Sequence, residues 1–284
     1  MLSGDVIVAV RQASMKAVPG RGLLVRGLRL LIVIVVLCGS RTAVTGAVQE
    51  RASLYASFSP DRLGASTTIS FGFRLSTTEG VAPPPLRNIA LRMPAGMNYT
   101  TTTLGLALCD PASLLSGGIE GCPANSRLGY GSALVEVPFG SGEAREVPEL
   151  QAVSGPSSNG NLVVLFYADG KSPISAQLVF KGEVLPASGI FGSELAAAVP
   201  PVPTVPDGPD VSILSAHTTI GPSHLTYYKH VHGKLVPFTP QGVGVPERCP
   251  HGGFPFAAQF TFQDGNHVDA SARVPCPRNR RTRH

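Results

Sequence analysis

The chain has 284 residues, a formal net charge of +5, 43% hydrophobic residues and 14% charged residues, and it contains 32 Gly, 26 Pro and no Trp. A hydrophobic fraction of this size can build a core, which excludes disorder driven by charge. The many Gly and Pro residues exclude a coiled coil or a long helical bundle.

The positive charge lies at the two ends of the chain. Residues 1–47 hold six basic residues against one acid, and residues 278–284 hold four arginines. The region between them has 13 basic and 17 acidic residues. A domain that binds nucleic acid is expected to carry a basic patch, so this mildly acidic region predicts no nucleic-acid partner. The basic tail is expected to be a solvated terminus.

Residues 1–47 have the order of a secretory signal peptide. Arginines precede nine apolar residues, 30–38, and small residues follow up to Ala47, where we expect cleavage. Nine residues are too few for a membrane-spanning helix of roughly 20. Translation from Met15 would give a signal of ordinary shape. We therefore expect a secreted protein, or one on the extracellular face of the cell envelope, whose membrane contact is confined to this segment. A membrane anchor formed by an uncleaved signal is the alternative.

Residues 48–277 have apolar side chains at every second position in several runs, which is typical of half-buried strands. The run 162–168 is apolar throughout, as in a strand covered on both faces. Short helices are expected only at 110–115 and 192–198. The pattern predicts an all-β fold, an antiparallel β-sandwich of the Ig-like kind, built as one large or two-lobed domain.

Residues 196–210 form the most proline-dense stretch of the chain. It could link two domains or cross over within one. As a separate domain, residues 211–277 would have only 67 residues, which is marginal for an independent core. We therefore expect one domain over 48–277.

Four cysteines remain once a signal that contains Cys38 is removed: Cys109, Cys122, Cys249 and Cys276. An even number in an exported chain implies disulfides. Three pairings are possible, and proximity favours Cys109–Cys122 and Cys249–Cys276. Because the sequence has no Cys-x-x-Cys pair, a zinc site is disfavoured.

The segment 256–274 predicts a hairpin. Its apolar residues face one another if a three-residue loop, Asp264 to Asn266, places Gln263 opposite His267. Either Gly265 or Asn266 is then expected to have a positive φ.

Candidate catalytic residues are few. The sequence has no Gly-x-Ser-x-Gly nucleophile elbow. A pair of carboxylates for glycoside hydrolysis could come from Glu136, Glu143, Glu146 and Glu149. Their positions on strand exteriors and in a loop instead predict a solvated surface. We expect no catalytic residues and no cofactor.

His230 and His232 are the residues most like metal ligands, because positions i and i+2 of a strand share one face. His224 could complete a site with three nitrogen ligands. The alternative is an exposed hairpin, which the neighbouring tyrosines and lysines favour. We therefore treat the three histidines as weak metal candidates.

Three stretches carry a resemblance to known proteins: residues 85–96, which end in Met-Pro-Ala-Gly, Cys109 with 122–129 (CPANSRLG), and 249–277. They resemble a group of bacterial exported proteins with an Ig-like β-sandwich and no established activity. The resemblance implies location and fold, and it supplies no catalytic residues.

We expect a secreted or cell-envelope protein without a catalytic role, which engages a protein or cell-surface partner through loops and strand edges. One alternative is an exported hydrolase whose catalytic residues are dispersed along the chain. Another is a metal- or ligand-binding module centred on His224, His230 and His232.

Overall fold

The computed structural model describes residues 8–10, 49–99, 103–139, 142–173, 175–202 and 210–277. The predicted signal peptide, apart from residues 8–10, lies outside these ranges, as does the basic tail.

The described residues are mostly β-strand, and every strand pair is antiparallel. The strands are β1 (Val8–Val10), β2 (Glu50–Ser59), β3 (Ser66–Thr77), β4 (Leu86–Pro94), β5 (Arg127–Phe139), β6 (Gly142–Glu146), β7 (Glu149–Ser158), β8 (Asn161–Gly170), β9 (Ala176–Pro186), β10 (Phe191–Ala198), β11 (Ser212–Ile220), β12 (Tyr227–Val231), β13 (Lys234–Phe238), β14 (Val243–Gly244), β15 (Phe254–Phe262) and β16 (His267–Val274). The helices are α1 (Pro111–Gly117) and the 3₁₀ turns η1 (Gly118–Gly121) and η2 (Ala124–Ser126). The predicted all-β antiparallel fold is confirmed.

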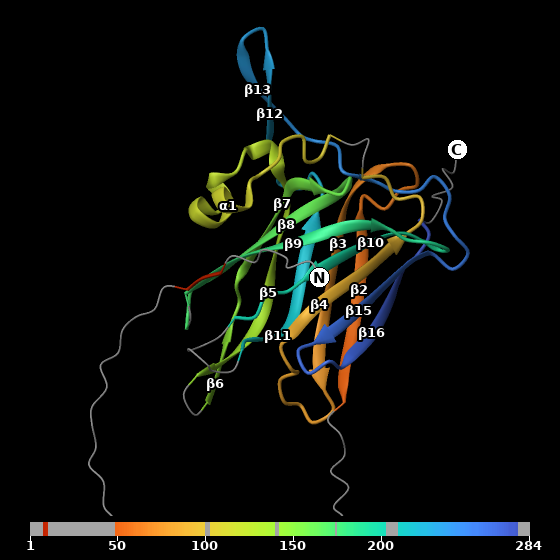
Figure 1. Cartoon of the computed structure of the whole chain (residues 1–284). Helices are drawn as coiled ribbons and strands as arrows, with labels where there is room; N and C mark the ends of the chain where they lie inside the picture. The colour runs from red at the N-terminus through yellow and green to blue at the C-terminus, as the bar shows by residue number, and fades with distance from the viewer. Residues whose placement is uncertain are drawn as a thin grey trace, which may run out of the picture.

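Fourteen of the described strands form one sheet, whose main path is β3-β11-β5-β7-β8-β9-β10-β4-β15-β16. Strand β2 adds to β3 at the start of this path. The sheet curls until it is nearly closed, so that β2 and β16 lie side by side (Figure 1). Opposite walls of one continuous sheet therefore pack together like the layers of a sandwich.

Aromatic side chains from opposite walls fill the core. The Phe73 ring of β3 lies 4.7 Å from the Phe260 ring of β15, and Phe58 of β2 packs against Phe254 and Phe256. These phenylalanines occupy alternate positions, so their strands turn one face inward and the other to solvent. Large aromatic side chains bury much apolar area, which makes this cluster a principal source of stability.

The outer face of β7, β8 and β9 is covered by α1 and the loop around it. Fully buried Leu114 of α1 packs with Val163, Leu165 and Tyr167 of β8, while Phe166 faces the inner core. This explains the uninterrupted apolar run at 162–168, which was predicted to be covered on both faces. The Asp110 side chain accepts a hydrogen bond from the Ser113 N–H and caps the helix.

The prediction of a second helix, at 192–198, is wrong. These residues belong to β10, where Leu195 and Ala197 point inward and Glu194 and Ala196 outward. Helix propensity of the alanines is weaker than the burial gained by pairing with β4 and β9.

Both favoured disulfides are present. Cys109 pairs with Cys122, and Cys249 pairs with Cys276, with Cα atoms 5.1 and 5.8 Å apart. The first joins the chain just before α1 to the chain just after η1, and the second closes the open end of the β15–β16 hairpin.

The proline-dense stretch joins two strands of the same sheet. It leaves β10, whose last residue is Ala198, and leads to β11, which lies between β3 and β5. Strands from before and after the crossover are therefore interleaved. The Val199 N–H donates to the Arg87 carbonyl and the Val211 N–H to the Val202 carbonyl, which fixes both ends of the crossover.

The β15–β16 hairpin keeps the predicted faces but not the predicted register. Phe260 lies opposite Val268, and the loop is shifted so that Phe262 lies across from Asn266. Gly265 has a φ of 89°, as expected. The Asp264 carboxylate accepts a hydrogen bond from the Asn266 N–H, which stabilises this turn.

Alkaline pH tests the burial of Tyr99, whose hydroxyl donates to the Met93 Sδ atom at 3.2 Å. Burial raises the pKa of Tyr99 to about 12, from an ordinary value of 10.0. Between pH 10 and pH 12, Tyr99 is deprotonated in the unfolded chain but still protonated in the folded one. The stability contributed by the protonated Tyr99 is therefore intact below pH 10, and the free energy of unfolding falls by about 2–3 kcal/mol as pH rises towards 12.

Urea titrations at several pH values measure this fall. The Tyr99→Phe variant provides the control, because it removes the titrating hydroxyl and keeps the ring. We expect its stability to decline less over the same interval. Equal declines in the two proteins would contradict the assignment.

Candidate functional site

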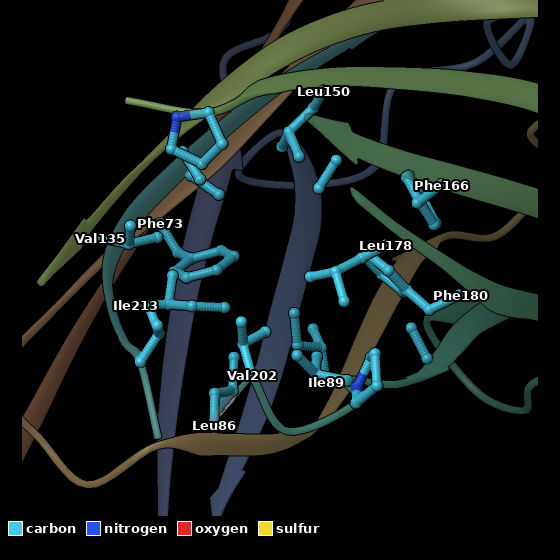
Figure 2. A pocket seen from close by; sticks show the side chains of 18 of the residues that line it. Phe73, Leu86, Ile89, Val135, Leu150, Phe166, Leu178, Phe180, Val202 and Ile213 are labelled. Carbon is cyan, nitrogen blue, oxygen red and sulfur yellow. The ribbon is translucent and has the colours of Figure 1, made fainter. Parts of the chain in front are cut away.

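The interior of the curled sheet contains an apolar cavity of about 160 Å³. It lies towards the end where β4, β7, β9 and β11 begin and where β5, β8 and β10 finish, as its lining residues show. Figure 2 shows the labelled side chains of several strands pointing into one space. The end that carries α1 is the opposite one (Figure 1).

The lining is almost entirely apolar. Among the described residues around the cavity, only Glu146 and Thr218 carry polar side chains. Such a lining cannot hold ordered water well, because a buried water needs two to four polar partners. The cavity therefore suits an apolar occupant.

Alanines at inward positions create the space. Larger side chains such as Phe73, Phe166 and Phe180 project into the same interior. Between them, six strands contribute a methyl group where a larger side chain would fill the gap: Ala133, Ala168, Ala176, Ala197, Ala216 and Ala258. Interiors are normally packed to crystal-like density, so a gap lined by alanines on separate strands is a feature to explain.

Prolines border the cavity at the strand ends. Pro85 precedes β4, Pro148 precedes β7, and Pro200 and Pro201 follow β10. A proline has no N–H, so these residues provide apolar surface without leaving a backbone donor unpaired. The described start of the crossover thus forms part of the cavity wall, with Val202 among the lining residues (Figure 2).

Glu146 places a carboxylate beside the apolar lining. Its side chain accepts hydrogen bonds from the backbone N–H groups of Lys171 and Ser172, which directly follow β8, the latter at 2.9 Å. The charge is therefore held by the β8–β9 connection. A second negative charge placed close to it would be repelled.

The other glutamates differ in their environments. Glu136 is buried, contrary to the expected solvated position, because β6 pairs with β5 and brings Arg145 directly opposite, at 3.3 Å. Glu143 is exposed, as expected. Glu149 lies opposite Asp169 in a separate polar hollow beside η1. This hollow also contains Ser116 and Glu120, and it gives the hydrolase alternative a location.

The three candidate histidines occupy different settings. His230 lies in β12, while His232 has a φ of 50° in the turn that follows, so the shared-face rule for strands does not apply to this pair. His224 packs edge-on against Tyr130, with ring centroids 5.9 Å apart. Within the described ranges, no three His, Cys, Asp or Glu residues come together as a metal site.

Comparison with known proteins gives no relative. The chain matches no protein-family model, no curated protein and no solved structure. The resemblance to exported Ig-like proteins therefore stays a prediction, and the cavity is the main structural basis for assigning a function. None of the helices in the described part of the chain is long and apolar enough to cross a membrane.

Sequence reasoning missed the cavity. The alternation identifies inward positions, and the inward alanines were visible in the sequence. The curl of the sheet brings β5, β9 and β10 together and so decides which alanines face a common space. The order of the strands in the sheet is set by long-range pairing, which the sequence pattern does not show.

Proposed function

We propose that this chain is an exported, non-enzymatic binding protein that holds a small apolar ligand inside its curled sheet. The apolar cavity of about 160 Å³ carries the proposal. Binding sites for small molecules are commonly concave, largely apolar and already formed in the free protein. The two disulfides and the signal-like N-terminus support export. An Ig-like relationship is part of the same proposal.

The volume limits the ligand. A dry engineered cavity of about 150 Å³ lined by Leu, Ile and Phe binds benzene. We therefore expect an occupant with an aromatic ring or a short alkyl chain. Because Glu146 contributes a carboxylate to the lining, a neutral alcohol is expected to bind better than the carboxylate of the same chain length.

Thermal unfolding of the full chain with benzene, indole and straight-chain alcohols from butanol to decanol tests this function. A ligand that binds only the folded state stabilises it by about 2.7 kcal/mol at a concentration of 100 times its Kd. For a domain of this size, that corresponds to a rise of about 5–10 °C in Tm. We expect such a rise for short alcohols, a loss of effect at longer chain lengths, and little effect from hexanoate.

Ala197→Phe and Ala196→Phe form a matched pair on β10. Ala197 lines the cavity, whereas Ala196 is on the outer face of the same strand. Filling the space at position 197 is expected to remove the ligand-induced rise in Tm, while the change at 196 keeps it. No rise in the wild-type protein, or equal rises in both variants, would refute the proposed function.

A further inference from the structure

The end of the molecule opposite the cavity carries the protruding hairpin β12–β13 (Figure 1). Eleven large hydrophobic side chains are exposed among the described residues, and five of them belong to this hairpin or to the loop beside it: Leu106, Leu108, Tyr228, Val231 and Leu235. Scattered exposed apolar residues need no explanation, but a concentration on one projection indicates a contact surface.

Hydrogen bonds hold the loop and the hairpin together. The Gly105 N–H donates to the Tyr227 hydroxyl at 2.9 Å. The Asn125 side-chain amide donates to the Tyr228 carbonyl at 2.7 Å and accepts from the Tyr228 N–H at 2.8 Å. The backbone carbonyl of Asn125 accepts a hydrogen bond from the Ala107 N–H. Since Leu106 lies between two of these anchored residues, the exposed leucines of the loop are fixed next to the base of the hairpin.

The hairpin is ordered before any partner binds. Its base is set by fully buried Tyr227, whose ring meets Phe238 edge-on at 5.8 Å. Its tip is a two-residue turn in which His232 and Gly233 have φ values of 50° and 76°, typical of a type I′ turn. Isolated two-stranded hairpins are marginally stable, so this anchoring is what presents Val231 and Leu235 in a fixed conformation. A preordered surface loses little conformational entropy on binding.

The projection is also cationic. Lys229 and Lys234 lie on the hairpin, and the sequence has no acidic residue between Asp210 and Glu247. The rest of residues 48–277 is mildly acidic, so the hairpin stands out from the domain that carries it. Exposed leucine and valine side chains next to lysines, without a nearby acid on the same element, match a surface that is both apolar and negatively charged.

We propose that this end of the molecule, formed by β12–β13 and the loop 105–108, docks on a membrane surface that contains anionic lipids. The tip of the hairpin, with Val231 and Leu235 on its two faces, enters the headgroup region, and Lys229 and Lys234 reach the lipid phosphates. This contact is separate from the predicted signal segment, to which the sequence alone confined membrane contact. It leaves the cavity at the far end of the sheet open to solvent-borne ligand.

Co-sedimentation of the full chain with sucrose-loaded vesicles tests the proposal. One set of vesicles is phosphatidylcholine alone, and the other is phosphatidylcholine mixed with phosphatidylglycerol. We expect strong partitioning to the mixed vesicles and weak partitioning to the neutral ones. The double variant Lys229→Gln/Lys234→Gln is expected to bind the mixed vesicles about 25-fold more weakly, at roughly fivefold for each basic residue.

Leu235→Asn and Val81→Asn separate the apolar contribution from general surface effects. Both residues are strongly exposed, but Val81 lies in the β3–β4 turn at the other end of the molecule. We expect Leu235→Asn to weaken partitioning about tenfold, as for a leucine that loses most of its burial, and Val81→Asn to leave it unchanged.

Three outcomes would overturn the membrane assignment. The first is wild-type protein that stays in the supernatant with mixed vesicles, and the second is binding that both asparagine variants reduce equally. The third is a dimer in analytical ultracentrifugation that Leu235→Asn dissolves, because the surface would then join two copies of the chain. The ligand experiment on the cavity is independent of these results.

Discussion

Replacing Phe260 by alanine is expected to lower the free energy of unfolding by about 3–5 kcal/mol. The side chain is fully buried, and its ring lies 4.7 Å from Phe73 on the opposite wall of the sheet. The change removes apolar burial and leaves a void that the surrounding strands cannot close without moving. Urea unfolding followed by circular dichroism measures the loss.

The neighbouring Gln259→Ala change is the matched control. Gln259 is exposed on the outer face of β15, where its amide donates to Asp269 at 3.2 Å. Substitutions at such surface positions usually change stability by less than about 0.5 kcal/mol. Comparable losses at 259 and 260 would mean that β15 is not the inward wall described above.

The same substitution also bears on ligand size, since Phe260 lines the cavity. The enlarged space in Phe260→Ala is expected to accept longer alcohols than the wild-type protein does and to regain part of its stability with them. A shift in the preferred chain length would tie the void created by the mutation to the site that binds ligand.

Local sequence patterns were enough to predict much of this fold. Period-two alternation predicted strands with one apolar face, and the structure shows this pattern in β2, β3, β4 and β5. The uninterrupted run in β8 is covered by α1 on one side and by the core on the other. These predictions succeeded because burial on one face of a strand leaves a direct trace in the residue types.

Predictions that depended on competition between local and distant contacts were less successful. The alanines of 192–198 indicate a helix when considered alone, but two neighbouring strands take them into the sheet. The turn of the β15–β16 hairpin is stabilised by the Asp264 side chain, and β15 also pairs with β4. Glu136 is buried because β6, a short strand of mainly polar residues, folds back onto β5.

The candidate site depended on a different kind of information. A cavity arises where inward alanines from separate strands face one space, and the order of strands in the curled sheet places β5, next to β11, across from β10 and β15. Sequence spacing carries no measure of that order. The histidines gave a visible local pattern, but the turn at His232 removed the geometry on which their interpretation rested.

Removing the Cys109–Cys122 disulfide with a Cys109→Ala/Cys122→Ala variant is expected to cost about 3 kcal/mol of stability, as for a loop of roughly 15 residues. Cys109 is fully buried beside Leu114, so the change also loosens the cover over β8. The loop that precedes Cys109 contains Gly105, which hydrogen-bonds to Tyr227 at the base of the hairpin. We therefore expect faster amide exchange at Gly105 and Tyr228 as well as a lower urea midpoint.

The Cys249→Ala/Cys276→Ala variant gives the comparison, because its disulfide closes a loop of 27 residues at the end of a different hairpin. The chain-entropy model assigns it a similar loss of stability, about 3–4 kcal/mol. The two variants are thus expected to differ in which amides lose protection from hydrogen exchange, not in how much stability is lost.

If exchange at Gly105 and Tyr228 rises equally in both variants, global unfolding governs these amides, and the disulfide next to α1 has no special part in holding the hairpin. If it rises only in the first variant, the cysteine loop is the support on which the proposed membrane contact depends, and vesicle binding is expected to fall in that variant alone.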